Sequence, residues 1–204
     1  FPVVILVNAA ALLLGDGSAA NISLCLGRRQ QREADDTIGH ALTLILLSGL
    51  CAAAVSWCCA PQIARLFGAT ATAWPESVAY LRTIAWGLPF QLICPAFTAI
   101  IRADGRPRYS MGCMITGAVL NLILDPIFIF PLGMGVVGAG IATVIGQVVS
   151  GLLFLIYLPR LQTVRLRRQA LRPTARLTGR ILALGFPSLL TQLLTALVQI
   201  TLNN

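Results

Sequence analysis

The sequence contains no lysine, and all 15 of its basic residues are arginine. Acidic residues are also few, at seven, so charged residues make up only 11% of the chain while hydrophobic residues make up 57%. A mean hydropathy of +0.83 excludes an ordinary soluble domain. The net charge of +8 would fit a nucleic-acid ligand, but the arginines lie in the gaps between apolar runs. That placement indicates contact with a lipid bilayer and no nucleic-acid partner.

Histidine is almost absent, which bears on catalysis. His40 is the single histidine, and the sequence has no nucleophile elbow, phosphate loop, or cluster rich in His or Asp. We therefore expect no enzyme and no cofactor, with His40 as an interfacial or packing residue. The cysteines lack the spacing of a metal site, so we expect reduced thiols that pack as small hydrophobic side chains. These six are Cys25, Cys51, Cys58, Cys59, Cys94 and Cys113.

Both ends of the sequence lie in apolar runs. The chain begins with Phe1-Pro2, without a basic region or a cleavage pattern of a signal peptide, and it ends at Asn203-Asn204. We expect a fragment cut from a longer polytopic membrane protein, with both cuts inside helices.

Six apolar segments are long enough to cross a bilayer, which takes about 20 residues in a helix. They lie at residues 1–26, 37–60, 78–101, 109–131, 135–158 and 178–202. The stretch Gly15-Asp16-Gly17-Ser18 interrupts the first segment, and Pro89 and Pro95 interrupt the third. The sequence predicts an all-α integral membrane protein, built as a polytopic helix bundle.

Thirteen of the arginines lie in alternate gaps, after the first, third and fifth segments, and only Arg65 and Arg82 fall on the other side. Arginine-rich loops stay in the cytoplasm. The sequence therefore predicts a multi-pass protein of the plasma (inner) membrane with residue 1 near the outer face. Residues 161–177 form the longest and most basic gap, which we interpret as a cytoplasmic linker between two lobes.

The apolar edge of this linker leaves two interpretations open: it lies on anionic headgroups, or the segment is a solvated loop. That edge consists of Leu161, Val164, Leu171 and Leu177. The nearby acidic residues are expected to be solvated, to offset the arginines or to belong to loops. They are Glu33, Asp35, Asp36 and Asp104.

Two polar residues in the fourth segment are the strongest functional candidates. Asn121 and Asp125 are four residues apart, so they share one face of a helix. A carboxylate in the hydrocarbon costs roughly 2.5–3.5 kcal/mol on insertion scales, so it usually faces the bundle interior or water and marks a function. Pro126 cannot donate to the carbonyl of Leu122, which leaves a free acceptor one turn below the carboxylate. Asp16 is a further intramembrane candidate.

The fifth segment carries two stripes. Thr143 and Gln147 form a polar stripe, which makes interhelical hydrogen bonds or joins a binding site; both interpretations remain open. Beside it, small residues recur at every fourth position, and such a ridge lets helix backbones approach closely in lipid. The ridge consists of Gly138, Ala142, Gly146 and Ser150.

Several motifs follow one another along nearly the whole chain. The first is Gly17-Ser-Ala-Ala-Asn-Ile-Ser-Leu-Cys-Leu-Gly27-Arg, with Glu33-Ala34 after it. The others are Leu66-Phe-Gly-Ala69, Tyr80-Leu-Arg82, Arg102-Ala-Asp-Gly105-Arg-Pro107, Asn121-Leu-Ile-Leu-Asp125-Pro126 and Gly138-Ala-Gly-Ile-Ala-Thr143-Val-Ile-Gly-Gln147. In order and spacing this set resembles the multidrug and toxic compound extrusion (MATE) transporters.

The resemblance implies a parent of twelve helices in two six-helix lobes, of which this chain holds helices two to seven. Residues 1–160 would be five helices of the N-terminal lobe, whose first helix is missing. Residues 161–177 would be the cytoplasmic linker, and residues 178–204 the truncated first helix of the C-terminal lobe.

In the family, an Asn and an Asp on the fifth helix and a Thr on the sixth contribute to a sodium or proton site. The matching positions are Asn121, Asp125 and Thr143, to which we add Asp16 and Gln147 as further candidates. Asp16 departs from the family pattern, which has an apolar or small residue there.

The resemblance implies that the parent protein is a monomeric antiporter. It would export amphipathic, often cationic organic compounds by alternating access. Burial disfavours the charged form of a carboxyl group, so H⁺ or Na⁺ would neutralise Asp125. The alternatives are a lipid-linked sugar flippase of the same broad superfamily and a non-transporting membrane bundle. A flippase grips pyrophosphate with basic residues inside its cavity, and Arg82 is the only arginine near a span interior.

Overall fold

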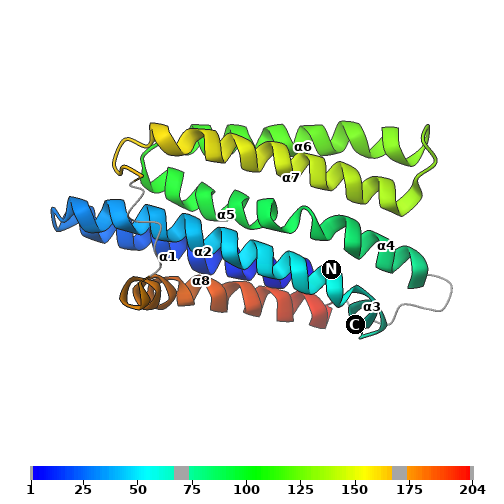
Figure 1. Ribbon diagram of the computed structural model, residues 1–204, viewed down its shortest axis with the longest axis horizontal. Helices are drawn as coiled ribbons and strands as arrows, with labels where there is room; N and C mark the ends of the chain where they lie inside the picture. Colours follow the sequence, from blue (N-terminus) through cyan, green and yellow to red (C-terminus); the bar gives the residue numbers. More distant parts are fainter. Residues whose placement is uncertain (1, 67–73, 167–173, 203–204) are drawn as a thin grey trace.

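The computed structural model describes residues 2–66, 74–166 and 174–202, and within these residues it contains long helices and no strand (Figure 1). In chain order the helices are α1 (Pro2–Gly27), α2 (Gln31–Cys58), α3 (Ala60–Leu66), α4 (Trp74–Ala85), α5 (Leu88–Ala103), α6 (Pro107–Ile129), α7 (Gly135–Tyr157), the 3-10 turn η1 (Leu158–Arg160) and α8 (Ala175–Leu202).

Six membrane spans can be formed from these helices. The helices α1, α2, α6, α7 and α8 are each long and apolar enough to cross a bilayer, and α4 with α5 makes a sixth, broken span bent by 52°. The break follows Ala85, because Pro89 cannot donate a hydrogen bond to the carbonyl of Ala85. The prediction of six apolar segments in an all-α membrane bundle is confirmed.

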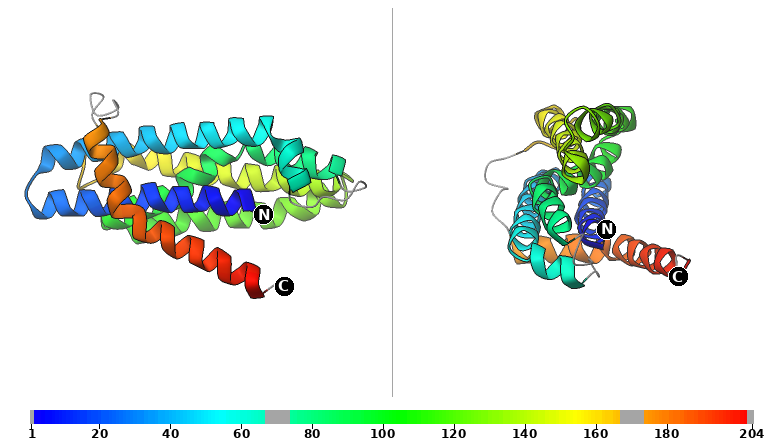
Figure 2. Two further views of the ribbon diagram at one scale, coloured as in Figure 1. Left: turned by 90° about the horizontal axis from the view of Figure 1, so that it is seen from below. Right: turned by 90° about the vertical axis from the view of Figure 1, so that its right-hand side faces the viewer.

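The glycines near the middle of α1 interrupt its apolar run but not the helix, which is continuous from Pro2 to Gly27. They are contact points instead. A side chain at Gly15 would collide with Ala96 of α5, and one at Gly17 would collide with Ile181 of α8. Small residues let helix backbones approach in this way in a membrane. Helix α8 accordingly packs on α1, crosses it obliquely and ends away from the bundle (Figure 2).

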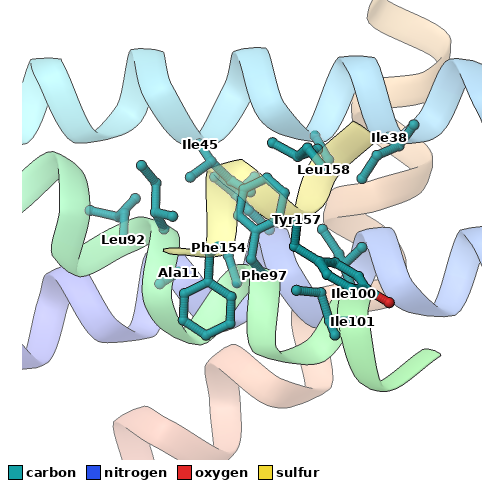
Figure 3. Close-up of a cluster of buried hydrophobic side chains, with 14 of the residues drawn as sticks. Ala11, Ile38, Ile45, Leu92, Phe97, Ile100, Ile101, Phe154, Tyr157 and Leu158 are labelled. Carbon is teal, nitrogen blue, oxygen red and sulfur yellow. The ribbon is translucent and has the colours of Figure 1, made fainter. Parts of the chain in front are cut away.

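Helix α5 lies at the centre of the bundle, between α1 and α2 on one side and α7 on the other (Figure 1). Its apolar side chains interlock with those of α2, α7 and η1 in the core shown in Figure 3. That core includes Ile38, Ile45, Leu92, Phe97, Ile100, Ile101, Phe154, Tyr157 and Leu158.

Helix α6 is attached to the bundle mainly through α7. The predicted small-residue ridge of α7 is buried throughout. A Cβ added at Gly146 would lie only 2.7 Å from the carbonyl oxygen of Gly117, so the two backbones nearly touch. The ridge therefore serves close helix packing, as its spacing predicted.

The apolar edge of the linker faces the protein. Leu161 and Val164 are buried in the main core, and Leu177 packs against it. Neither the headgroup nor the solvated-loop interpretation holds for these three residues, and Leu171 lies outside the described residues.

Asp104 lies in the turn between α5 and α6, as expected of a loop residue, and its carboxylate also holds the linker in place. It is 5% exposed and caps the C-terminal end of α5. Its oxygens accept hydrogen bonds from the backbone N–H groups of Gln162 (3.0 Å) and Thr163 (2.8 Å), the Thr163 hydroxyl (2.6 Å) and the Tyr157 hydroxyl (3.2 Å).

Asp35 was expected to be solvated or to offset an arginine, but it is 9% exposed and binds backbone and side-chain N–H groups. Its carboxylate accepts from the backbone N–H of Arg165 at 2.8 Å and from the side chain of Gln31 at 3.2 Å. Gln31 also donates to the carbonyl of Thr163 at 2.6 Å. Asp36 is exposed, as predicted.

Two side chains of α2 fix the start of α8. His40 is 1% exposed, and its Nε2 accepts the backbone N–H of Thr174 at 3.0 Å, with the Thr178 hydroxyl also at 3.0 Å. Glu33 pairs with Arg180 at 3.3 Å, so it offsets an arginine as expected. His40 is therefore a packing residue with a specific hydrogen-bonding task.

Candidate cation site

A polar cluster joins α6 to α7. The Nδ2 atom of Asn121 donates to Oδ1 of Asp125 at 3.3 Å and to Oγ1 of Thr143 at 3.2 Å. The Thr143 hydroxyl donates to the carbonyl of Ala139 at 2.9 Å, so it meets Asn121 as an acceptor. The three side chains are half-buried. The structure thus brings together the three residues that the resemblance singled out.

The close approach of α6 and α7 sets this geometry. Asn121 and Asp125 stack because they are one helical turn apart on α6. On α7, Gly146 faces Asn121, and a Cβ added there would lie 3.4 Å from the Cβ of Asn121. Because no side chain separates the helices here, the Asn121 amide reaches Thr143 directly.

Asp125 has no cationic neighbour in the described part of the chain, where the ion pair found is Arg180 with Glu33. An ionised carboxylate in a membrane span requires compensation. Helix α6 continues through Pro126, which cannot donate to the carbonyl of Leu122. The Asp125 carboxylate and the Leu122 carbonyl on α6, together with the Thr143 hydroxyl on α7, therefore offer oxygen atoms on two adjoining helices.

Oxygen atoms of this kind suit a proton or a hard cation such as Na⁺, rather than a transition metal. Among the described residues no group of three or more His, Cys, Asp and Glu could hold a metal ion. The cluster fits the predicted monovalent cation.

Gln147 lies one turn from Thr143 on α7 but bonds in another direction. Its Nε2 donates to Oε1 of Gln91 on α5 at 3.2 Å, and Nε2 of Gln91 donates to Oδ1 of Asn8 on α1 at 3.4 Å. The Oε1 of Gln147 is buried without a hydrogen-bond partner. The interhelical interpretation of Gln147 is thus correct for its amide nitrogen.

Two pockets adjoin these polar residues. The smaller, of about 210 Å³, is lined by Cys94, Met114, Gly117, Ala118, Asn121, Thr143, Gly146, Gln147 and Ser150. The larger, of about 350 Å³, is lined by Asn8, Leu12, Gln91, Cys94, Pro95, Met114, Gln147 and Gln192. The second pocket includes Gln192 of α8, so it lies between α8 and residues of α1, α5, α6 and α7.

Asp16 is not brought into this cluster. It is half-buried on α1, and it makes no hydrogen bond or ion pair within the described ranges. It lines neither of the two pockets described above. Its proposed part in cation binding therefore has no support from contacts with Asn121, Asp125 or Thr143.

A family model described as MatE matches residues 1–127. This chain belongs to the MatE family. The match covers the whole of α1 to α5 and all of α6 up to the residue after Pro126, so both Asn121 and Asp125 fall inside it.

Sequence relatives agree with this assignment. The MATE chain is 31% identical over 192 residues to the multidrug export protein MepA of Staphylococcus saprophyticus, covering 94% of this chain and 43% of that protein. It is 29% identical over 203 residues to MepA of Staphylococcus haemolyticus, covering 99% and 45%. The chain spans a little under half the length of these relatives.

Solved structures support the same fold. A MATE protein in a bent conformation matches with a TM-score of 0.90 and 32% identity over 100% of this chain and 46% of that one. An inward-facing multidrug resistance MATE transporter matches with a TM-score of 0.87 and 32% identity, over 95% and 44%. The helix arrangement of this MATE chain is therefore that of the matched part of these structures, a little under half of each.

Sequence reasoning missed Asn8 and Gln91, which the structure links to Gln147. Both are polar residues inside apolar runs, so the signal that pointed to Asn121 was available for them too. Asn8 on α1 and Gln91 on α5 are neutral amides, whereas the intramembrane candidates centred on the ionisable residues Asp125 and Asp16.

Proposed function

We propose that this MATE chain is part of an antiporter of the plasma membrane that exports amphipathic, often cationic organic compounds in exchange for H⁺ or Na⁺. The observation that carries the proposal is Asp125, an intramembrane carboxylate without a cationic partner in the described residues, which Asn121 bridges to Thr143. The parent acts as a monomer of two lobes.

In this mechanism the coupling ion neutralises Asp125, while Asn121 and Thr143 supply neutral oxygens. A cation shifts the balance between inward- and outward-facing states only by the difference in its affinity for the two. Loading and release of the ion at opposite faces then drive the conformational cycle. The chain's own contribution is to hold the three side chains at hydrogen-bonding distance.

The larger pocket is the proposed place for the transported compound. Its volume of about 350 Å³ lies in the range of drug-sized sites, roughly 300–1,000 Å³. Apolar side chains and neutral amides line it, which suits an amphipathic compound. The names of the MepA relatives, as multidrug export proteins, support this substrate class.

The two alternatives find less support. A sugar flippase needs basic residues in its cavity, but Arg82 lies over the ring of Trp57, 5.9 Å from its centroid, and lines neither pocket. In a purely structural bundle Asp125 would join helices, whereas its hydrogen bond is to Asn121 of its own helix.

The test uses the full protein that contains this chain, reconstituted in vesicles with an imposed Na⁺ or H⁺ gradient. We expect wild type to export a fluorescent cationic dye under one gradient and Asp125→Asn to lose that dependence. Asp36→Asn, which changes an exposed carboxylate, is the matched control and should behave as wild type. Gradient-driven efflux by an inserted Asp125→Asn protein would refute the coupling site, and Asp16 would be tested next.

A further inference from the structure

A chain of amides begins beside the cation site and crosses the bundle to α1. Gln147 on α7 donates to Gln91 on α5 at 3.2 Å, and Gln91 donates to Asn8 on α1 at 3.4 Å. Three helices are therefore connected by side chains that carry no charge, and each amide uses one of its two ends to contact the next.

Gln147 stands where the two pockets meet. Cys94, Met114 and Gln147 line both of them, and Gln147 is the member of this trio whose side-chain amide belongs to the hydrogen-bonded chain. It lies one helical turn from Thr143, so the two side chains share a face of α7. A movement of the Gln147 amide therefore changes the lining of both pockets at once.

The present position of this amide is incompletely bonded. Its Oε1 is buried, lacks a hydrogen-bond partner and lies against Gly87, at the break between α4 and α5. A buried carbonyl oxygen without a donor is unfavourable. Turning Oε1 toward the cation site would give it a cationic partner, but Nε2 would then have to leave Gln91. Since Oε1 and Nε2 belong to one amide, a turn of Oε1 away from Gly87 breaks the contact of Nε2 with Gln91.

We propose that Gln147 is a positioning residue that couples the cation site to the substrate pocket. When the cation binds between Asp125 and Thr143, Gln147 turns its Oε1 toward it and releases Gln91. Gln91 and Asn8 then rearrange, and the larger pocket binds the transported compound less well. By linkage, the compound must weaken cation binding by the same factor. This inference rests on the proposed antiport function and deepens it.

The test measures the dissociation constant of a fluorescent cationic dye for the full protein with and without the coupling ion, as saturating Na⁺ or as low pH. The ratio of the two constants is the coupling factor, which typically lies at about 5–150 for coupled sites. We expect Gln147→Met and Gln91→Met to bring this ratio close to one, because each removes one end of the first amide contact while keeping side-chain length.

Gln192→Met is the matched control, since Gln192 lines the larger pocket but takes no part in the amide chain. It should leave the ratio at the wild-type value, whatever it does to dye affinity itself. A wild-type ratio in both Gln147→Met and Gln91→Met would overturn the inference while leaving antiport intact. A ratio of one in wild type would instead remove the proposed function. If one of the two variants does not fold, the other still decides.

Discussion

Both hydrogens of the Asn121 amide are used at the cation site, one for Asp125 and one for Thr143. The amide therefore orients the carboxylate and the hydroxyl toward each other across α6 and α7. The side-chain oxygen Oδ1 of Asn121 remains available to a cation, since it has no hydrogen-bond partner in the described residues. Asn121 therefore positions the side chains of the site, and Asp125 contributes its carboxylate.

Thr143 offers a sharp test of this arrangement. We expect Thr143→Val to weaken binding of the coupling ion by about fivefold, because a typical hydrogen bond contributes about 1 kcal/mol and Asn121 would lose an acceptor. The measurement is ion-dependent dye efflux at varied Na⁺ concentration or pH.

Thr116→Val is a closely matched control. Its hydroxyl, like that of Thr143, donates to the carbonyl four residues earlier in its own helix, here Gly112 at 2.8 Å, but it accepts nothing from Asn121. The control should keep wild-type ion dependence. Equal losses in the two variants would show that the hydroxyl of Thr143 matters only within its helix.

The sequence predicted this site only in part, for a physical reason. Asn121 and Asp125 are neighbours on one helix, so their spacing alone placed them together. The polar stripe of α7 left the role of Thr143 open, and only the family resemblance grouped Thr143 with Asn121 and Asp125. The buried roles of Asp104 and Asp35 were not predicted, because backbone donors that bind them lie in the linker, 58 to 130 residues away. Periodicity reports local geometry and cannot reveal such distant partners.

At the scale of helices, the α6–α7 pair depends on two glycines that face each other. A Cβ at Gly117 would lie 2.7 Å from the carbonyl of Gly146 and would also collide with the Ser150 hydroxyl. Ser150 in turn donates to the carbonyl of Cys113 at 2.9 Å. This contact holds α6 close enough for Asn121 to reach Thr143.

Two glycines of α6 allow a comparison within one helix. We expect Gly117→Ala to lower stability by about 1–3 kcal/mol, as overpacking of a tight contact does, and to reduce ion affinity with it. Gly112→Ala should be neutral or slightly stabilising, because nothing lies within 4 Å of the added Cβ. Thermal unfolding of the full protein in detergent measures both. Equal stability of the two variants would refute the close contact.

At the scale of the whole molecule, α2 and the end of α5 hold the segment that leads to α8. Asp104 and Asp35 bind backbone N–H groups of residues 162–165, and beyond residues 167–173 His40 and Glu33 hold the start of α8. All these contacts lie at the arginine-rich end of the bundle. Hydropathy predicted the six spans, but residues 162–165 are held against the bundle by the buried carboxylates of Asp104 and Asp35.

The Asp104 carboxylate can be tested as the group that holds the linker. Asp104→Asn replaces an acceptor-only carboxylate with a neutral amide that keeps one acceptor oxygen: with this oxygen at the Oδ1 position, the NH₂ lies at the Oδ2 position against the Gln162 N–H, and every remaining hydrogen bond loses its charged acceptor. Hydrogen bonds to charged groups contribute about 1.5–3 kcal/mol, so the open state of residues 161–166 should become at least about tenfold more populated. Trypsin cleavage after Arg165, followed by mass spectrometry under conditions where cleavage tracks local opening, measures this change.

Asp36→Asn, at the same end but exposed, should cleave like wild type. Unchanged cleavage in Asp104→Asn would mean that the buried apolar side chains of Leu161 and Val164 hold the linker without the carboxylate.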